Sequence, residues 1–178
     1  MKRLLLALAL THCLPAEPLK KPEFLQEYCE TRGYALGRPV KPRFTPDGRL
    51  LFLRSPGDSR TQSLYEWKDG KAHLLLAPNQ EEKLSPEEKA RNERKRQLGT
   101  GFTEFFPNPK DGSILLPLAG RLILLKEKAR ALPIEGAIDP QWSPDGSKIA
   151  YVKAQDLWLY DLKAGKERRL TSGGSKEL

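Results

Sequence analysis

Short apolar runs separated by glycine-containing turns recur along this chain. The clearest example begins with Trp-Ser-Pro-Asp-Gly at 142–146 and continues into the strand-like run 147–152. A second apolar run at 156–162, a turn at 163–166 and a further run at 167–171 complete the unit. Proline presets φ for such a turn, and glycine accepts positive φ. Each turn therefore reverses the chain between two apolar runs, and the pattern predicts four short antiparallel strands.

Two further copies of this unit precede it. One carries Phe-Thr-Pro-Asp-Gly at 44–48, and a weaker one carries Lys-Asp-Gly at 110–112. Repeated four-stranded units are typical of β-propellers. The predicted fold class is therefore all-β, a partial β-propeller of about three four-stranded antiparallel blades within residues 44–178. The blades are expected at about 44–78, 102–133 and 140–171.

A propeller blade stacks between two neighbours, so we expect nearly continuous apolar runs such as 157–160 to be buried on both faces. Closed propellers have about four to eight blades. Three blades leave open edges and an uncovered apolar face. We therefore expect either that more sequence normally follows Leu178 or that the chain self-associates through its open blade edges.

The spacing of the turns predicts one helical insertion, at 80–98. The distance from Asp111 to Asp145 is 34 residues, whereas that from Asp47 to Asp111 is 64. Within the excess, Ser-Pro-Glu-Glu at 85–88 is a strong N-terminal helix signal, and Gly99 is a stop signal. The predicted helix is polar nearly all round, which is typical of a helix held by a partner surface.

The first residues have the order of a secretory signal peptide, which we place at 1–16. Met1, Lys2 and Arg3 precede a short apolar stretch that is not long enough to span a bilayer. The alternative is a buried N-terminal helix. A signal peptide implies a secreted or periplasmic protein with no membrane attachment after cleavage. Residues 17–43 then form a leader segment, with one short helix around 24–31.

Charge and chemistry exclude several functions. The formal net charge is +8, but acidic residues are mixed with the basic ones, so we predict no nucleic-acid binding. There is no G-x-S-x-G motif, and the histidine outside the signal, His73, lies in an apolar strand. No metal-ligand spacing or phosphate-binding loop is present, so no catalytic residue, metal or cofactor is predicted. Cleavage leaves Cys29 alone, and we expect it to be a buried structural residue.

Several motifs together resemble the N-terminal β-propeller of the dipeptidyl peptidase IV-type proteins of the prolyl oligopeptidase family. They are Gly-Arg-Pro at 37–39, the corner at 44–48, the helix motif Ser-Pro-Glu-Glu-Lys-Ala-Arg at 85–91, and Asp-Leu-Trp-Leu-Tyr at 156–160. The helix motif, which ends in Glu-Arg-Lys-Arg at 93–96, is especially similar to the branch of dipeptidyl peptidases 8 and 9. The likeness covers roughly residues 34–178.

The resemblance implies a role for the insertion. In this family, secreted serine peptidases remove N-terminal dipeptides, and an arginine of the helical insertion contacts the peptide. By position, Arg96 is the first candidate for this substrate-binding residue and Arg94 the second. The guanidinium is a planar, permanently charged fork that suits a carbonyl or carboxylate. The alternative is that both arginines belong to a solvated charged helix.

The resemblance also implies what these residues lack. The paired glutamates of the family, its Ser/Asp/His triad and its α/β-hydrolase domain are expected after Leu178, so this chain alone is expected to be inactive. The first hypothesis is the N-terminal propeller fragment of a secreted serine dipeptidyl peptidase, which gates and binds the peptide N-terminus. The alternative is a non-enzymatic periplasmic propeller module for protein–protein binding.

Overall fold

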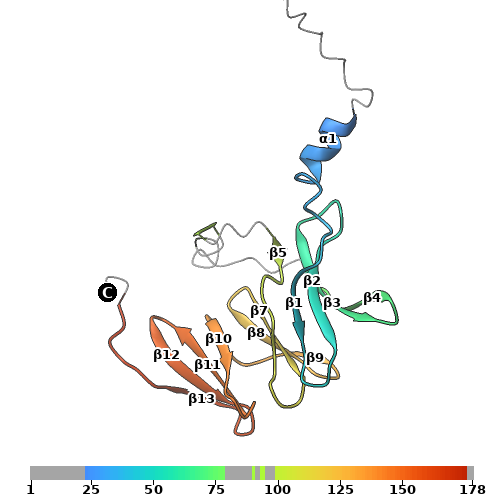
Figure 1. Cartoon of the computed structure of the whole chain (residues 1–178). Coiled ribbons are helices and arrows are strands. Elements are labelled where there is room, and N and C mark those ends of the chain that lie inside the picture. Colours follow the sequence, from blue (N-terminus) through green and yellow to red (C-terminus); the bar gives the residue numbers. More distant parts are fainter. Residues whose placement is uncertain (1–22, 79–89, 91–92, 95–98, 176–178) are drawn as a thin grey trace, which may run out of the picture.

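The computed structural model describes residues 23–78, 90, 93–94 and 99–175. One helix, α1 (Glu23–Glu30), precedes three antiparallel sheets (Figure 1). Each sheet contains a four-stranded meander in which consecutive strands are neighbours, and the first sheet has a fifth, short strand. The predicted fold class, a partial β-propeller of three four-stranded blades, is confirmed. The proposed signal peptide and most of the insertion lie outside the described residues, but Ala90, Glu93 and Arg94 of the insertion are helical.

The strands of each sheet follow one another directly along the chain. The first sheet contains β1 (Val40–Phe44), β2 (Leu50–Arg54), β3 (Thr61–Lys68) and β4 (Lys71–Leu76). The second contains β6 (Phe106–Pro107), β7 (Ile114–Leu118), β8 (Arg121–Leu125) and β9 (Ala129–Ala131). The third contains β10 (Ile138–Trp142), β11 (Lys148–Lys153), β12 (Asp156–Asp161) and β13 (Lys166–Arg169). A short strand, β5 (Thr100–Gly101), joins the first sheet by pairing in parallel with β3.

Two-residue turns close one hairpin in each sheet. Asp69-Gly70 joins β3 to β4, Ala119-Gly120 joins β7 to β8, and Ala154-Gln155 joins β11 to β12. All six residues have positive φ. Two consecutive positive φ values define the type I′ turn, whose twist matches that of the flanking strands. Asp69-Gly70 is the Asp-Gly pair that this turn type favours.

The three sheets stack in chain order, with the second between the other two. One buried cluster joins the first and second sheets through residues such as Leu51, Leu53, Ile114 and Leu116. Another joins the second and third sheets through residues that include Leu115, Leu124, Ile149 and Tyr151. Consecutive residues of β7 thus enter different clusters, because side chains alternate across a strand.

The outer faces of the first and third sheets differ from the middle sheet. Leu157 of β12 is 39% exposed and Trp67 of β3 is 50% exposed. The expectation that the run 157–160 is buried on both faces is therefore wrong, because no sheet of the described residues covers the far side of β12. Burial on both faces holds for β7, where Ile114, Leu115 and Leu116 are all buried.

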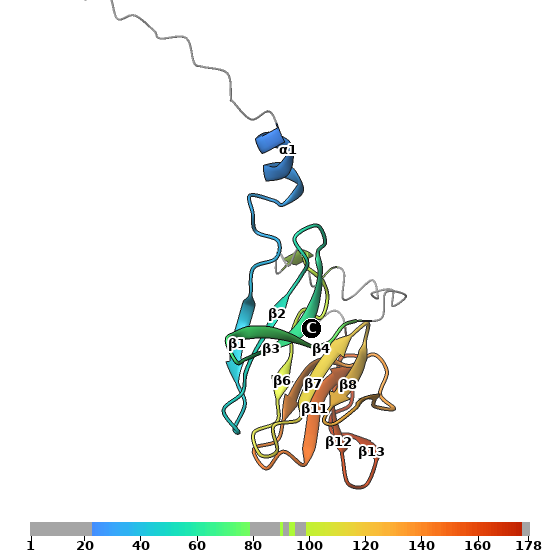
Figure 2. The same ribbon diagram turned by 90° about the vertical axis from the view of Figure 1, so that its right-hand side faces the viewer.

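Helix α1 projects away from the sheets (Figures 1 and 2). It matches the short helix predicted around residues 24–31, and none of its residues is buried. Phe24, Tyr28 and Tyr34 pack their rings against one another beside it. The prediction of a buried Cys29 is wrong: the thiol lies on this helix and is exposed.

Candidate functional site

The insertion that carries the candidate arginines leaves and rejoins the first sheet at one place. Thr100 N donates to Arg60 O over 2.9 Å, and Phe102 N donates to Gln62 O over 3.0 Å. Phe102 and Phe105, which follow, are fully buried between the first and second sheets. The returning chain is therefore fixed by both hydrogen bonds and apolar anchors.

Glycine is required where the two ends of the insertion meet. Gly101 has a φ of +72°, and a Cβ there would lie 2.6 Å from Gln62 O and 2.8 Å from Pro78 Cγ. Pro78 immediately precedes the insertion, so the outgoing and returning chains touch at this point. Gln62 Oε1 is buried beside them with no hydrogen-bond partner among the described residues.

The structure describes one of the two candidate arginines. Arg94 is helical and exposed, which leaves its guanidinium accessible from solvent. Arg96 lies outside the described residues. The base of the insertion is therefore held firmly on the first sheet, and Arg94 is the candidate arginine that the described residues include.

A charged cluster that the sequence did not single out joins β1 to the segment between β5 and β6. Lys41 Nζ donates to Thr103 O over 2.7 Å and forms an ion pair with Glu104. Arg43 Nη2 lies 3.9 Å from the second oxygen of the same carboxylate. The Arg43 guanidinium also sits 5.5 Å from the ring centroid of Phe106. Two cations thus share one carboxylate where the first sheet meets the second.

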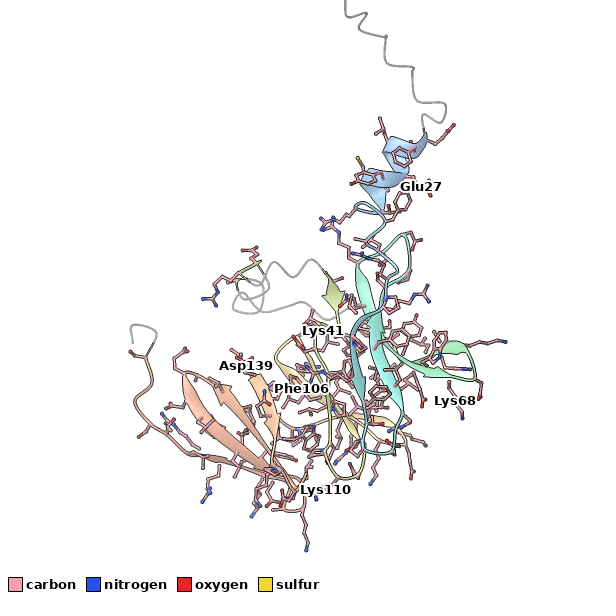
Figure 3. The ribbon with its side chains drawn as sticks, in the orientation of Figure 1. Glu27, Lys41, Lys68, Phe106, Lys110 and Asp139 are labelled. Atoms are coloured by element: carbon pink, nitrogen blue, oxygen red, sulfur yellow. The ribbon has the colours of Figure 1, made fainter. Side chains whose placement is uncertain are left out.

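Lys41 and Asp139 occupy equivalent places in their sheets. Phe44 pairs with Leu50 and Trp142 with Ile149, so each charged residue lies three positions before the end of its pairing strand. Both have positive φ, +54° and +50°, at an irregularity of the strand. Positive φ is uncommon outside glycine and is concentrated at functional sites. Figure 3 shows Lys41, Phe106 and Asp139 in the middle of the molecule.

A repeat in the sequence marks these positions. Pro42, which follows Lys41, lies four residues before the corner proline Pro46. Pro140, which follows Asp139, lies four residues before the corner proline Pro144. The spacing of charged residue, proline and corner is therefore the same in the first and third copies. The repeated unit therefore begins upstream of the Pro-Asp-Gly corners, at these charged residues.

A pocket opens beside Arg43, at the ends of β1 and β6. It has a volume of about 570 Å³ and is lined by Arg43, Phe44, Thr45, Pro46, Pro107 and Pro109. The lining combines proline and aromatic carbon with one guanidinium and one hydroxyl. This depression is shallow and wide open to solvent.

The described residues hold no arrangement for bond cleavage. His73 is on β4 and exposed, and no serine, histidine and carboxylate of the described part come together as a triad. Nor does any group of three or more potential metal ligands form among these residues. In the same part of the chain, no helix has the length and hydropathy needed to cross a membrane.

Residues 124–178 match a family model, the "Dipeptidyl peptidase IV (DPP IV) N-terminal region". The matched stretch begins within β8 and contains the whole third sheet. This supports the resemblance to the N-terminal propeller of that family over the last part of the chain. The match includes neither the insertion nor the charged cluster of the first two sheets.

A second similarity is to a propeller-type protein. The "Protein TolB homolog" of Protochlamydia amoebophila (strain UWE25) is 33% identical over 69 residues. These residues make up 36% of this chain and 13% of that protein. The chain therefore matches only a small part of this relative.

Proposed function

We propose that this chain is the N-terminal propeller part of a secreted serine dipeptidyl peptidase, close to the branch of dipeptidyl peptidases 8 and 9. In this role the propeller limits access to a separate α/β-hydrolase domain and holds the amino end of a peptide substrate. The observation that carries the proposal is the match of residues 124–178 to the dipeptidyl peptidase IV N-terminal region.

The insertion supplies the substrate contact in this proposal. Its base is fixed on the first sheet by the contact between Pro78 and Gly101, so the helix is presented from a firm support. Arg96 first, and Arg94 second, then donate to the carbonyl or carboxylate groups of the peptide. Hydrogen bonds from a charged donor are about twice as strong as neutral ones.

The test is an activity assay on the complete reading frame that contains these residues, with a chromogenic dipeptide bearing proline second. We expect a Glu-Glu pair and a G-x-S-x-G motif after Leu178, together with activity. Arg96→Ala should raise KM by roughly tenfold to a hundredfold, since a charged hydrogen bond contributes about 1.5–3 kcal/mol. Lys89→Ala, on the same predicted helix, is the matched control and should leave KM unchanged.

Secretion has a separate test. When the gene is expressed with its own N-terminus in a bacterium with a periplasm, we expect the exported product to begin at Glu17. N-terminal sequencing of the periplasmic fraction measures this directly. A product that keeps Met1 and stays in the cytoplasm would contradict secretion without touching the peptidase proposal.

The similarity to the TolB homolog favours a second candidate, a non-enzymatic periplasmic propeller module that binds a protein partner. The two candidates differ in the same assay. A reading frame that stops without a G-x-S-x-G motif, and whose product cleaves no dipeptide substrate, supports the module and excludes the peptidase.

A further inference from the structure

Arg43 of β1 and Phe106 of β6 occupy the same place in the first and second sheets. Arg43 pairs with Leu51 and Phe106 with Leu115, and each is the residue before the last pair of its strand. Leu51 and Leu115 both face the next sheet along the chain. Because directly paired residues lie on one face, Arg43 and Phe106 face the next sheet as well.

The two equivalent positions differ in chemistry. Phe106 is partly buried and packs against the cluster that joins the second and third sheets. Arg43 has the same place at the junction of the first and second sheets, but it carries a permanent positive charge there. The repeat therefore uses this position for apolar packing in one sheet and for an arginine in the other, which calls for a role of the guanidinium.

The surroundings of Arg43 orient its guanidinium without using its hydrogen-bond donors. The guanidinium carbon lies 5.8 Å from the ring centroid of Phe105 and 5.5 Å from that of Phe106. Phe105 is fully buried. Nη2 lies 3.9 Å from Oε2 of Glu104, which is beyond hydrogen-bond distance. Within the described part of the chain the guanidinium donates no hydrogen bond, and the side chain is 44% exposed.

The charges around Arg43 leave an excess of positive charge. Lys41 forms an ion pair with Glu104, and Arg43 lies beside the same carboxylate. These three side chains therefore carry two positive charges and one negative charge. Because Lys41 already neutralises Glu104, the charge of Arg43 is left for a further anion.

The open depression beside Arg43 supplies an apolar surface next to this charge. Pro46 lines it from the first sheet, and Pro107 and Pro109 line it from the second. Sites for small molecules enclose most of the ligand surface, which a shallow depression cannot do. An extended peptide, in contrast, gains contacts along its length on an open surface.

We propose that Arg43 binds a side-chain carboxylate of an acidic, extended peptide, whose apolar residues lie on the three prolines of the depression. The planar fork of the guanidinium accommodates both oxygens of one carboxylate. The net charge of +8 attracts acidic ligands to the whole chain, whereas Arg43 supplies the specific contact. The proposal concerns binding alone and does not rest on the peptidase function.

Fluorescence anisotropy of dye-labelled peptides with the 178-residue chain tests the proposal. The probe is an octapeptide of alternating glutamate and proline, because proline-rich chains are extended in water. The comparison peptide carries glutamine in place of every glutamate and keeps the prolines. We expect saturable binding of the glutamate peptide and at least roughly tenfold weaker binding of the glutamine peptide. No saturation, or equal affinity for the two peptides, would overturn the proposal.

Variants separate the proposed contact from general attraction to a basic chain. Arg43→Gln should weaken binding of the glutamate peptide by roughly tenfold or more. Arg168→Gln is the matched control, since it removes one positive charge from an exposed position of β13 and should leave the affinity nearly unchanged. Arg43→Lys keeps the charge but loses the fork, so it should retain only part of the affinity. Equal weakening by Arg43→Gln and Arg168→Gln would contradict the site.

Glu104→Gln gives a result that a damaged fold cannot imitate. It removes the carboxylate beside Arg43 and leaves two cations unopposed, so the glutamate peptide should bind severalfold more tightly. Weaker binding by this variant, with an unchanged circular dichroism spectrum, would contradict the proposal. Free glutarate should displace the peptide poorly, because it lacks the apolar contacts. Displacement by glutarate at the concentration of the peptide would show that the site takes small dicarboxylates, and would overturn the assignment to a peptide.

Discussion

The second and third sheets each contain a nearly continuous apolar strand, but these two strands have different surroundings. They are β7 of the second sheet and β12 of the third. In β7, Ile114 is 1% exposed and Leu115 and Leu116 are fully buried. In β12, Tyr160 is 4% exposed but Leu157 is 39% exposed.

The difference shows what a neighbouring blade contributes. The strand β7 lies between two sheets and sends alternate side chains into both buried clusters. The strand β12 has one sheet beside it and buries only the side chains that face that sheet. An apolar run therefore specifies a strand that can be covered on both faces, and the number of neighbours decides whether it is.

The largest expected effect tests this difference between β7 and β12 directly. We predict that Leu115→Ala lowers the free energy of unfolding by about 2–5 kcal/mol, the usual cost of emptying a buried leucine site. Leu157→Ala should cost less than about 1 kcal/mol, because part of that side chain is already in water. Urea unfolding followed by tryptophan fluorescence measures both.

Equal losses for Leu115→Ala and Leu157→Ala would mean that the far face of the third sheet is covered by another part of the same chain.

A smaller effect is expected at the base of the insertion. Gly101→Ala should cost about 2–3 kcal/mol, because it combines a positive φ with a collision against the backbone of β3. Gly48→Ala should cost about 1 kcal/mol, because its φ is also positive but the space around it is open. Thermal unfolding of both variants checks the difference. Equal costs would show that the ends of the insertion are not held together.

The strands and turns could be predicted from the sequence because the corner chemistry is local. The register of the first sheet could not. Aligning the copies on Pro-Asp-Gly places Leu51 opposite Ile149, yet these residues face different neighbours. In the first corner Thr45 N donates to Arg49 O, whereas in the third Ser143 N donates to Lys148 O, one residue further along. A slip of one residue turns every side chain to the other face.

The candidate arginines stay a prediction. Arg94 and Arg96 were put forward by the family resemblance, together with the local helix signal at 85–88. Neither of these identified Lys41 and Glu104, which lie 63 residues apart and meet only when the first two sheets stack. A side chain whose role depends on long-range packing leaves a weak local signal, and here that signal was the repeated spacing of charged residue and proline.

A third prediction concerns how the third sheet is held on its covered side. Tyr151 Oη donates to Glu167 Oε2 over 2.6 Å, and burial followed by this hydrogen bond raises the pKa of the tyrosine. Tyr151→Phe should lower the free energy of unfolding by about 1–2 kcal/mol. Tyr160→Phe is the matched control in the same buried cluster, and its hydroxyl makes no hydrogen bond within the described residues. Calorimetry of the two variants measures the difference, and a larger loss for Tyr160→Phe would contradict it.

The smallest expected effect tests whether the hydrogen bonds within each corner depend on a neighbouring sheet. Hydrogen bonds from Ser143 and Ser147 hold the pKa of Asp145, in the third corner, far below its usual range. In the second corner, burial raises the pKa of Asp111, but hydrogen bonds from Ser113 and the ion pair with Lys126 together outweigh this and leave the pKa lowered. Both carboxylates therefore stabilise the fold above the pKa of an unfolded aspartate, about 3.9, and this stability is lost as the pH falls below that value.

We accordingly expect Asp145→Asn to make the loss of stability between about pH 5 and pH 2 shallower, because one carboxylate that must be protonated has been removed. Asp111→Asn should also make this loss of stability shallower. The sheet that contains Asp111 is covered on both faces, whereas the sheet that contains Asp145 is covered on one. Asp58→Asn, in the loop between β2 and β3, serves as the control. Urea midpoints measured across this pH range decide the matter. If only the variant in the covered sheet responds, the corner hydrogen bonds depend on the neighbouring blade and are not a property of each repeat alone.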